Sequence, residues 1–410
     1  MEYDEIVDMS QWDDEKLERE IRQEVKVRLS GSDYLEDDSI SAVIRGVICE
    51  YGQKISLPIS RRKQIERRIF NSFRRLGVLQ DFLDDSEVTE VMVNGYNRIY
   101  VERKGEMILT GEAFSSPQEY EDLIQKIVAR RNKIVNETVP IVDTRLDDGS
   151  RINIVLSPVA IQGSVMTIRK FPEEAISMAD LIDLGSIGKK EAEFLRDLVE
   201  SKYNIFISGG TSSGKTTFLG ALTEFVGDSE RVICIEDSAE IQFQKGLNLV
   251  RLESRDKNIE GKNEITIREL VKTSLRMRPD RLIVGECRGP ETFEMLQAMN
   301  TGHDGCFSTG HANSSQDMIS RLESMALMAE RLPIEVVRSL IVSGIDIIVH
   351  LERGRDGRRR MKEICEMDSM KDDEVKVRKI VEFDEESGAW VWKRGLKDTL
   401  KKSYLKGTYV

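Results

Sequence analysis

Residues 204–217 read Asn-Ile-Phe-Ile-Ser-Gly-Gly-Thr-Ser-Ser-Gly-Lys-Thr-Thr, and this stretch decides the fold. The run Asn204–Ser208 is short and apolar, which is typical of a buried parallel strand. Thr217–Leu222 and Phe225 follow with helical spacing. A strand, a glycine loop and a helix in this order predict a phosphate-binding loop, because backbone N–H groups and the positive end of the helix dipole then face the phosphates.

The loop supplies the side chains that a nucleotide site needs. We expect Lys215 to reach the β- and γ-phosphates, and the Thr216 hydroxyl to bind Mg²⁺. The predicted cofactors are therefore ATP and Mg²⁺. The predicted nucleotide-binding residues of this segment are Gly209, Gly210, Thr211, Ser212, Ser213, Gly214, Lys215, Thr216 and Thr217.

Two carboxylates follow a second apolar run, at residues 231–235. Glu236 comes directly after the run and Glu240 comes four residues later. Ligands bind outside the carboxyl ends of parallel strands, so both carboxylates are expected close to the phosphates. Either one could hold Mg²⁺ through water or help to orient the attacking water. Capping of the following turn is the structural alternative for each.

A third apolar run, at residues 281–284, ends in Gly285 and Glu286. Many phosphate-loop enzymes carry a magnesium-holding aspartate followed by a catalytic glutamate at this point. Gly285 occupies the aspartate place, so only Glu286 remains to polarise the water that attacks the γ-phosphate. The missing aspartate shifts the expected metal contacts onto Glu236 or Glu240.

Two of the three histidines, His303 and His311, fall within nine residues around the short apolar run 306–308. We expect both at the same edge of the sheet. At least one of them is predicted to sense the nucleotide or to contact a neighbouring subunit. A third ligand is missing from this segment, which argues against a metal site.

Arg251 and Arg255 form a further pair of candidate catalytic residues. Their spacing places both guanidinium groups on one face of a helix, or both outward on an extended chain. Arginine suits the charge of a transferring phosphoryl group, and it can act within its own subunit or from a neighbour. Solvated surface charge is the alternative for this pair.

Bulk composition restricts the class of protein. Of the 410 residues, 40% are hydrophobic and 33% charged, and the net charge is −12, which is typical of a soluble protein and argues against nucleic-acid binding. Met1–Glu20 holds nine acidic residues where a secretory signal needs a basic start. The five cysteines are scattered, and apolar runs are too short to span a bilayer. These features predict a cytoplasmic protein without a transmembrane segment.

Changes of pattern along the chain predict its domains. Strands that alternate with helices after the glycine loop predict an α/β fold with a mostly parallel sheet. Alternating runs at Val88–Val93 and Arg98–Glu102, separated by Asn94-Gly95, predict a hairpin upstream. The expected domains are an N-terminal helical segment (1–80), a small α/β domain (81–172), a linker with a first helix (173–200), the phosphate-loop domain (201–355), and a charged C-terminal hairpin and tail (356–410).

Taken together, the motifs resemble those of the type II/type IV secretion-system ATPase superfamily. The glycine loop is followed in family order by Ile235-Glu236-Asp237-x-x-Glu240, by Arg278–Gly289 and by the two-histidine segment. Met92–Gly95 and Asp143–Asn153 extend the resemblance upstream. The upstream match favours the tight-adherence (Flp) pilus assembly ATPases, the CpaF-like branch.

This resemblance implies a motor that converts ATP to ADP and phosphate in a cytoplasmic homo-hexameric ring at the inner face of the cell membrane. Each subunit would join a PAS-like N-terminal domain to a RecA-like ATPase domain, with ATP at their junction. Arg145, Arg151 and Arg169 match positions that face the nucleotide or the adjoining subunit, and Arg251 and Arg255 match the arginine-finger region. The expected partners are inner-membrane pilus platform proteins.

Two other functions remain open at this stage. A RecA-like fold also builds nucleic-acid translocases, although the net charge of −12 and the lack of a basic strip with interleaved aromatic residues oppose that function. The glycine at position 285 also leaves room for a nucleotide-dependent assembly module with little turnover.

Overall fold

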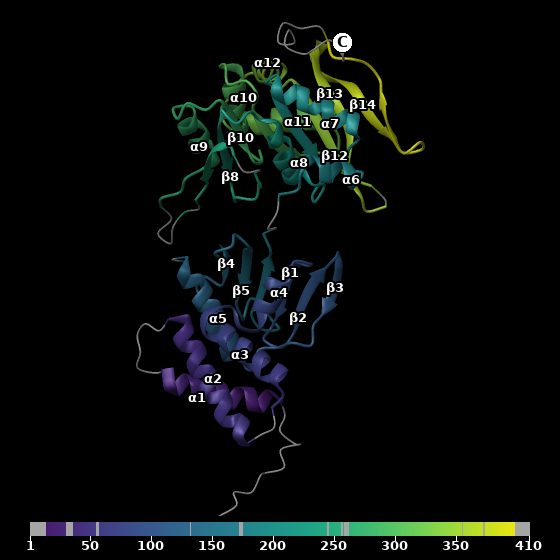
Figure 1. Cartoon of the computed structure of the whole chain (residues 1–410). Coiled ribbons are helices and arrows are strands. Elements are labelled where there is room, and N and C mark those ends of the chain that lie inside the picture. The colour runs from purple at the N-terminus through teal and green to yellow at the C-terminus, as the bar shows by residue number, and fades with distance from the viewer. Residues whose placement is uncertain are drawn as a thin grey trace, which may run out of the picture. The chain divides into compact units, whose positions relative to one another are not determined.

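The structure is a computed structural model of the chain (Figure 1), and it forms two compact units, residues 1–172 and 173–410. It describes residues 14–29, 36–54, 57–131, 133–171, 175–243, 246–255, 257, 262–354, 356–371 and 374–397.

Three helices form the first part of the first unit. They are α1 (Asp14–Leu29), α2 (Asp37–Lys54) and α3 (Ile59–Arg74). Fully buried side chains at spacings of three or four, such as Ile44 on α2 and Ile65 and Ile69 on α3, form a small core between them. These helices lie within the segment 1–80 that was expected to be helical, of which residues 1–13, 30–35 and 55–56 lie outside the described ranges.

A six-stranded sheet and the helix α5 (Pro117–Arg130) form the rest of this unit. The strand order is β3-β2-β1-β6-β5-β4, and every neighbouring pair is antiparallel. The predicted hairpin is confirmed, since β1 pairs with β2 across the Asn94-Gly95 turn. The bounds are η1 (Gly77–Leu79), α4 (Gln80–Asp84), β1 (Val88–Asn94), β2 (Ile99–Arg103), β3 (Glu106–Leu109), β4 (Ile141–Arg145), β5 (Arg151–Val155) and β6 (Val165–Arg169).

The second unit is built on a nine-stranded sheet in the order β15-β14-β13-β12-β7-β11-β10-β8-β9. The six strands from β12 to β9 run parallel to their neighbours, and β13, β14 and β15 join them antiparallel. The bounds are β7 (Ile205–Gly209), β8 (Arg231–Glu236), β9 (Asn248–Glu253), β10 (Arg281–Val284), β11 (Phe307–His311), β12 (Ile347–Arg353), β13 (Arg359–Lys371), β14 (Glu374–Asp384) and β15 (Ala389–Trp392).

Helices cover both faces of this sheet, because alternate strand residues are apolar on either side. On β7, Ile205 and Ile207 pack against α6, α7 and α8, whereas Phe206 packs into the core of α9 to α12. The helix bounds are α6 (Met178–Asp183), α7 (Lys189–Glu200), α8 (Lys215–Leu222), η2 (Thr223–Phe225), α9 (Ile267–Ser274), α10 (Glu291–Asn300), α11 (Ser315–Leu327) and α12 (Ile334–Gly344). None of the described helices is long and apolar enough to cross a membrane.

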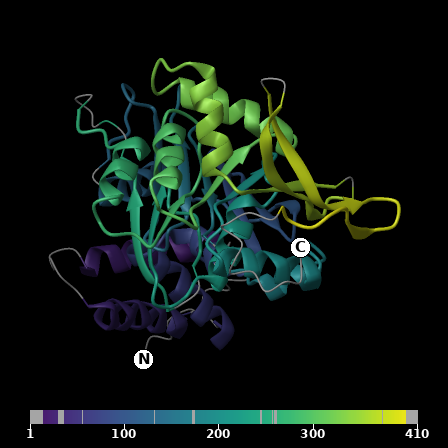
Figure 2. The same cartoon turned by 90° about the horizontal axis from the view of Figure 1, so that it is seen from above.

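The C-terminal strands extend the same sheet beyond residue 355. Figure 2 shows these yellow strands running out along one side of the unit. β13 pairs with β12 from the register Arg353↔Arg359 onward. Trp392 on β15 meets Phe194 of α7 edge-on, with ring centroids 5.2 Å apart, and donates a hydrogen bond to Glu191. The expected C-terminal hairpin is therefore part of the main sheet, and the remainder of the expected tail, 398–410, lies outside the described residues.

Candidate active site

The glycine loop lies at the carboxyl end of the central strand β7. Gly209 ends the strand, and a Cβ there would lie 2.5 Å from the Leu351 carbonyl oxygen, so only glycine fits. Ser212 and Gly214 both have positive φ angles, +57° and +92°, which turn the chain sharply before α8 begins at Lys215. Thr216 and Thr217 occupy the first turn of α8, where the helix dipole is positive.

The Lys215 ammonium points back into the loop. Its Nζ donates hydrogen bonds to the carbonyl oxygens of Gly209 (3.2 Å) and Gly210 (2.8 Å), and lies 3.3 Å from Nδ1 of His311. Burial of the side chain lowers the pKa of this ammonium below its usual value, while the nearby Glu286 carboxylate opposes the shift. The lysine is thus positioned by the loop that it serves.

His311 connects this lysine to Glu286. The parallel register aligns His311 on β11 with Gly209 on β7, and Glu286 follows β10, the other neighbour of β11. Nε2 of His311 lies 3.0 Å from Oε1 of Glu286. Burial and the adjacent Lys215 lower the pKa of His311, so the imidazole is neutral at pH 7.

The two carboxylate oxygens of Glu286 have different surroundings. Its Oε2 accepts a hydrogen bond from Arg288 at 2.8 Å, whereas Oε1 is buried, lies 3.0 Å from Nε2 of His311 and has no hydrogen-bond partner among the described residues. Burial alone would raise the pKa of Glu286, but the hydrogen bond and charge of Arg288, with His311 and Lys215, bring the pKa below its usual value. The group is an ionised carboxylate just after β10, as a water-polarising residue requires.

The expectation that both histidines share one edge of the sheet is wrong. β11 runs from Phe307, aligned with Ile205, to His311, aligned with Gly209. His303 precedes this strand and therefore lies at the amino end of the sheet. The phosphate loop lies at the carboxyl end, so the length of β11, about four residue steps or ~13 Å, separates the two ends. The expected apolar strand is present, but His303 precedes its first residue and His311 is its last residue, so the two histidines lie toward opposite ends of the strand.

Glu236 is almost fully buried at the end of β8, and both of its oxygens are occupied. Oε1 accepts hydrogen bonds from the backbone N–H groups of Glu240 and Ile241, each at 2.7 Å. Oε2 pairs with Nη2 of Arg251 at 2.9 Å. This carboxylate holds the turn after β8 and fixes Arg251, so its contacts are those of a structural anchor.

Glu236 also explains why position 285 is glycine. A Cβ on Gly285 would lie 2.9 Å from Cγ of Glu236, closer than side chains normally approach. The aspartate found here in many phosphate-loop enzymes would collide with the buried glutamate. The buried Glu236 on β8 and Gly285 after β10 are therefore packed against each other, and a larger residue at 285 would not fit.

Glu240 lies in a second, more open group of charges around Arg288. Glu286, Asp237 and Glu240 all raise the pKa of this arginine, with the Glu286 hydrogen bond the largest contribution. Sequence reasoning missed Arg288 as a site residue, although its place two residues after Glu286 in a loop at the strand ends was a usable signal. Arg288 therefore balances the negative charge of these three carboxylates.

Arg251 and Arg255 have different surroundings. Arg251 lies on β9, paired with Glu236 and with its guanidinium 5.7 Å from the Phe243 ring centre. Arg255 is exposed and lies beyond β9, in an isolated bridge with Ile265, where its Nε donates to the Asn263 carbonyl oxygen. Both arginines are exposed, but Arg251 pairs with a buried carboxylate, whereas Arg255 donates to a backbone carbonyl oxygen.

Three arginines of the first unit form a row on its sheet. In the strand register Arg145 is opposite Arg151, and Arg151 is opposite Arg169, so the three side chains share one face at one end of the sheet. Glu90 neighbours the row and lies 3.7 Å from Arg169.

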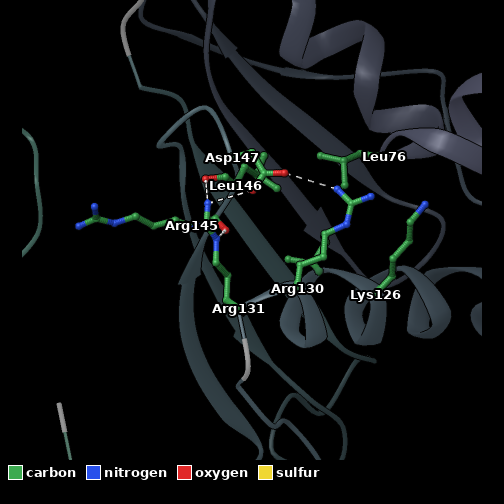
Figure 3. A pocket seen from close by; sticks show the side chains of 8 residues that line it. Leu76, Lys126, Arg130, Arg131, Arg145, Leu146 and Asp147 are labelled. Carbon is green, nitrogen blue, oxygen red and sulfur yellow. Dashed lines mark hydrogen bonds and ion pairs between the residues drawn. The ribbon is translucent and has the colours of Figure 1, made fainter. Parts of the chain in front are cut away.

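A small pocket lies beside this row (Figure 3). Arg130 and Arg131 converge there on the Asp147 carboxylate, with N–O distances of 3.7 and 3.1 Å. Figure 3 shows the Arg145 side chain pointing away from this group. The ion pairs that line this pocket therefore hold the backbone around Arg145 in place. The Arg145 guanidinium points away from them.

Comparison with known proteins places these features in a family. The model of the family described as "Type II/IV secretion system protein" matches residues 74–379. A Mycobacterium tuberculosis protein whose name refers to conjugal transfer is 32% identical over 70% of this chain and 83% of its own length. The type IV secretion system protein VirB11 of Brucella abortus is 30% identical over 69% of this chain and 86% of its own.

A solved structure shows a similar fold. The pilus retraction motor PilT, with bound ADP, aligns over 70% of this chain and 81% of its own, with a TM-score of 0.54 and 21% identity. At that identity the likeness concerns the fold alone.

Proposed function

This chain belongs to the type II/IV secretion system protein family. We propose that it hydrolyses ATP and that the hydrolysis drives the assembly process that such a system carries out. The observation that carries the proposal is the continuous set of contacts from the phosphate loop to Glu286. Lys215 lies 3.3 Å from His311, and His311 lies 3.0 Å from Oε1 of Glu286. A phosphate-binding ammonium and a water-polarising carboxylate are thus linked by one neutral imidazole.

The residues suggest a division of roles. Loop N–H groups and Lys215 bind the β- and γ-phosphates, and the Glu286 carboxylate accepts a hydrogen bond from the attacking water. His311 holds both partners in place, and its neutral state avoids a second positive charge beside the lysine. We leave His303 out of this mechanism because it lies at the opposite end of β11.

The site also suits Mg²⁺, which supplies charge neutralisation at the phosphates when bound. Thr216 offers its hydroxyl from the first turn of α8, and the ionised Glu286 carboxylate suits a metal-bound water. Glu240 is the candidate carboxylate for an outer contact, since both oxygens of Glu236 are occupied by Arg251 and two amides. This set fits an ion held mostly through water.

A steady-state phosphate-release assay with Mg²⁺ and ATP tests the proposal on the full chain. Glu286→Gln should lower kcat by roughly 10²- to 10³-fold while nucleotide binding persists, because the acceptor for the water proton is lost. Lys215→Ala should abolish binding. Glu335→Gln, an exposed glutamate at the start of α12, is the matched control and should retain full activity. Absence of phosphate release from the wild type would contradict hydrolysis and favour a low-turnover assembly module.

The arginine row supports a contribution from the first unit, which we propose to be PAS-like, to the nucleotide site of a hexameric ring. Its three adjacent positive charges suit phosphate oxygens, and Arg251 and Arg255 could serve the same charge. Mixing Arg151→Ala with Lys215→Ala chains distinguishes the donor subunit. Recovery of activity in mixed rings indicates donation from a neighbour, whereas continued inactivity indicates donation within one chain.

Within the family we propose a tight-adherence (Flp) pilus assembly ATPase that acts on an inner-membrane platform protein from the cytoplasmic side. The upstream motifs Met92–Gly95 and Asp143–Asn153 support this branch. Sedimentation with nucleotide should give six times the 46.8 kDa subunit mass. Restoration of pilus fibres in a strain lacking the gene should require Glu286, and normal pili with Glu286→Gln would contradict the assignment.

A further inference from the structure

A C-terminal arginine touches the phosphate loop from outside. Strand β12 lies beside β7, with Leu351 aligned with Gly209, so the chain that follows β12 passes the loop. A tight turn through Gly354 and Gly357 then reverses the chain, and β13 begins at Arg359 opposite Arg353. Arg359 therefore lies beside the phosphate loop, next to the end of β12.

Arg359 makes two contacts with the loop. Its Nε donates a hydrogen bond of 3.0 Å to the carbonyl oxygen of Ser212. Its Cδ lies 3.5 Å from the position that a Cβ on Gly214 would occupy, so the side chain covers that glycine. Ser212 and Gly214 are the two loop residues with positive φ angles, and the arginine contacts both.

This hydrogen bond fixes the direction of a peptide group. In a planar trans peptide the carbonyl oxygen of Ser212 and the N–H of Ser213 point in opposite directions. With the oxygen held outward by Arg359, the Ser213 N–H points inward, where it meets the Gly210 carbonyl oxygen at 3.4 Å. Lys215 Nζ donates to that same oxygen at 2.8 Å. Two donors thus converge inside the loop on one acceptor, which a phosphate oxygen could replace.

We propose that Arg359 is a positioning residue of the nucleotide site, which presets the phosphate loop by holding the Ser212 carbonyl outward. The inference rests on the proposed nucleotide binding and extends it to a strand beyond the loop's own strand and helix. Because Arg359 starts β13, it also ties the loop to the C-terminal strands. Its exposed side chain has no other described bond within residues 14–397, so the loop contact is its main interaction.

The test compares Arg359→Ala, Arg359→Lys and Arg358→Ala in the full chain, by calorimetric titration with Mg-ADP and by steady-state phosphate release. Arg358 is an exposed neighbour whose described hydrogen bonds involve its backbone only, so its variant is the matched control. We expect Arg359→Ala to weaken ADP binding and raise KM roughly tenfold, the effect of losing one charge-assisted hydrogen bond. kcat should change little, because Glu286 and His311 are untouched.

Two further results separate positioning from general stability. The thermal midpoint without nucleotide should match the wild type for Arg359→Ala, and Arg359→Lys should recover part of the affinity as an alternative donor. If Arg359→Ala binds ADP within twofold of Arg358→Ala, the inference is overturned while the proposed function stands. If wild type and Lys215→Ala bind ADP equally, the proposed function itself fails, and the inference with it.

Discussion

Arg251 donates a hydrogen bond from Nη2 to Oε2 of Glu236 across 2.9 Å, from the edge strand β9 to its neighbour β8. The other oxygen of Glu236 binds two backbone amides of the following turn. One carboxylate therefore fixes an arginine and a turn together. In any role toward a neighbouring subunit, Arg251 would start from this ion pair with Glu236.

Replacing Glu236 should lower stability before it affects chemistry. Glu236→Ala leaves two amides and a guanidinium without their acceptor, so we expect the free energy of unfolding to fall by roughly 3 kcal/mol. Glu236→Gln keeps an amide-accepting oxygen and should lose about half as much. Urea unfolding without nucleotide or Mg²⁺ measures both. Unchanged stability of Glu236→Ala would return Glu236 to the metal-binding candidates.

Gly285 should not accept a side chain. Gly285→Ala places a Cβ 2.9 Å from Cγ of the buried Glu236, so something must move. We expect a loss of about 1–3 kcal/mol in unfolding free energy, as for other overpacked sites, and a lower kcat because Glu286 is adjacent. Gly227→Ala, where the nearest contact is an ordinary 3.4 Å, is the control and should change stability by less than about 0.5 kcal/mol. Equal losses in the two variants would contradict this packing argument.

The two histidines should differ in their effect on turnover. His311→Ala removes the group between Lys215 and Glu286, and we expect kcat to fall by roughly 10²-fold. His303→Ala, at the other end of β11, should stay within about threefold of the wild type if only long-range packing is altered. Phosphate release under saturating ATP measures both, and an equal loss for His303→Ala would remove the assigned role of His311.

The buried His350 should make stability depend on pH. It lies on β12 with Nδ1 3.1 Å from the Ser208 hydroxyl, and burial lowers its pKa below 6.5, although Glu363, Glu352 and Asp317 oppose the shift. The unfolded chain then binds the proton more readily, so stability is full above pH 6.5 and is lost as the pH falls toward the lowered folded pKa.

The measurement is the thermal midpoint between pH 7.5 and 5. His350→Gln should show a shallower decline in this range than the wild type. Carboxylates with lowered pKa values, such as Glu363, titrate below 4.5 and contribute only at lower pH. Identical slopes for the two proteins would contradict the assignment to His350.

Local order made part of the site predictable. The glycine loop and Glu286 follow their strands directly in the sequence, so the order strand, loop and helix indicates their place. The pairing of Glu236 with Arg251 was not predictable in the same way, because it joins two strands through a contact between side chains. The two histidines were misplaced because the short apolar run did not show that each flanks a different end of the strand.

The strand that carries Arg359 was not predictable from the sequence, because it contains many charged residues. β13 reads Arg-Arg-Met-Lys-Glu-Ile-Cys-Glu-Met-Asp-Ser-Met-Lys, which suggests a polar surface segment. Glu363 and Glu366 are nevertheless buried, because Lys379 and Arg378 on β14 neutralise them. Pairing of charges across strands allows a hydrophilic sequence to enter a core, and single-sequence patterns do not reveal such partners.

The pairing of β12 with β13 has a practical consequence for anyone trimming this protein. A fragment that stops near residue 355 would strip the cover from β12 and leave its N–H and C=O groups along an open border. Such a border templates strands of other molecules, so the fragment should precipitate or form ordered stacks. A shortened form of the protein should therefore keep β13, which pairs with β12 along this border.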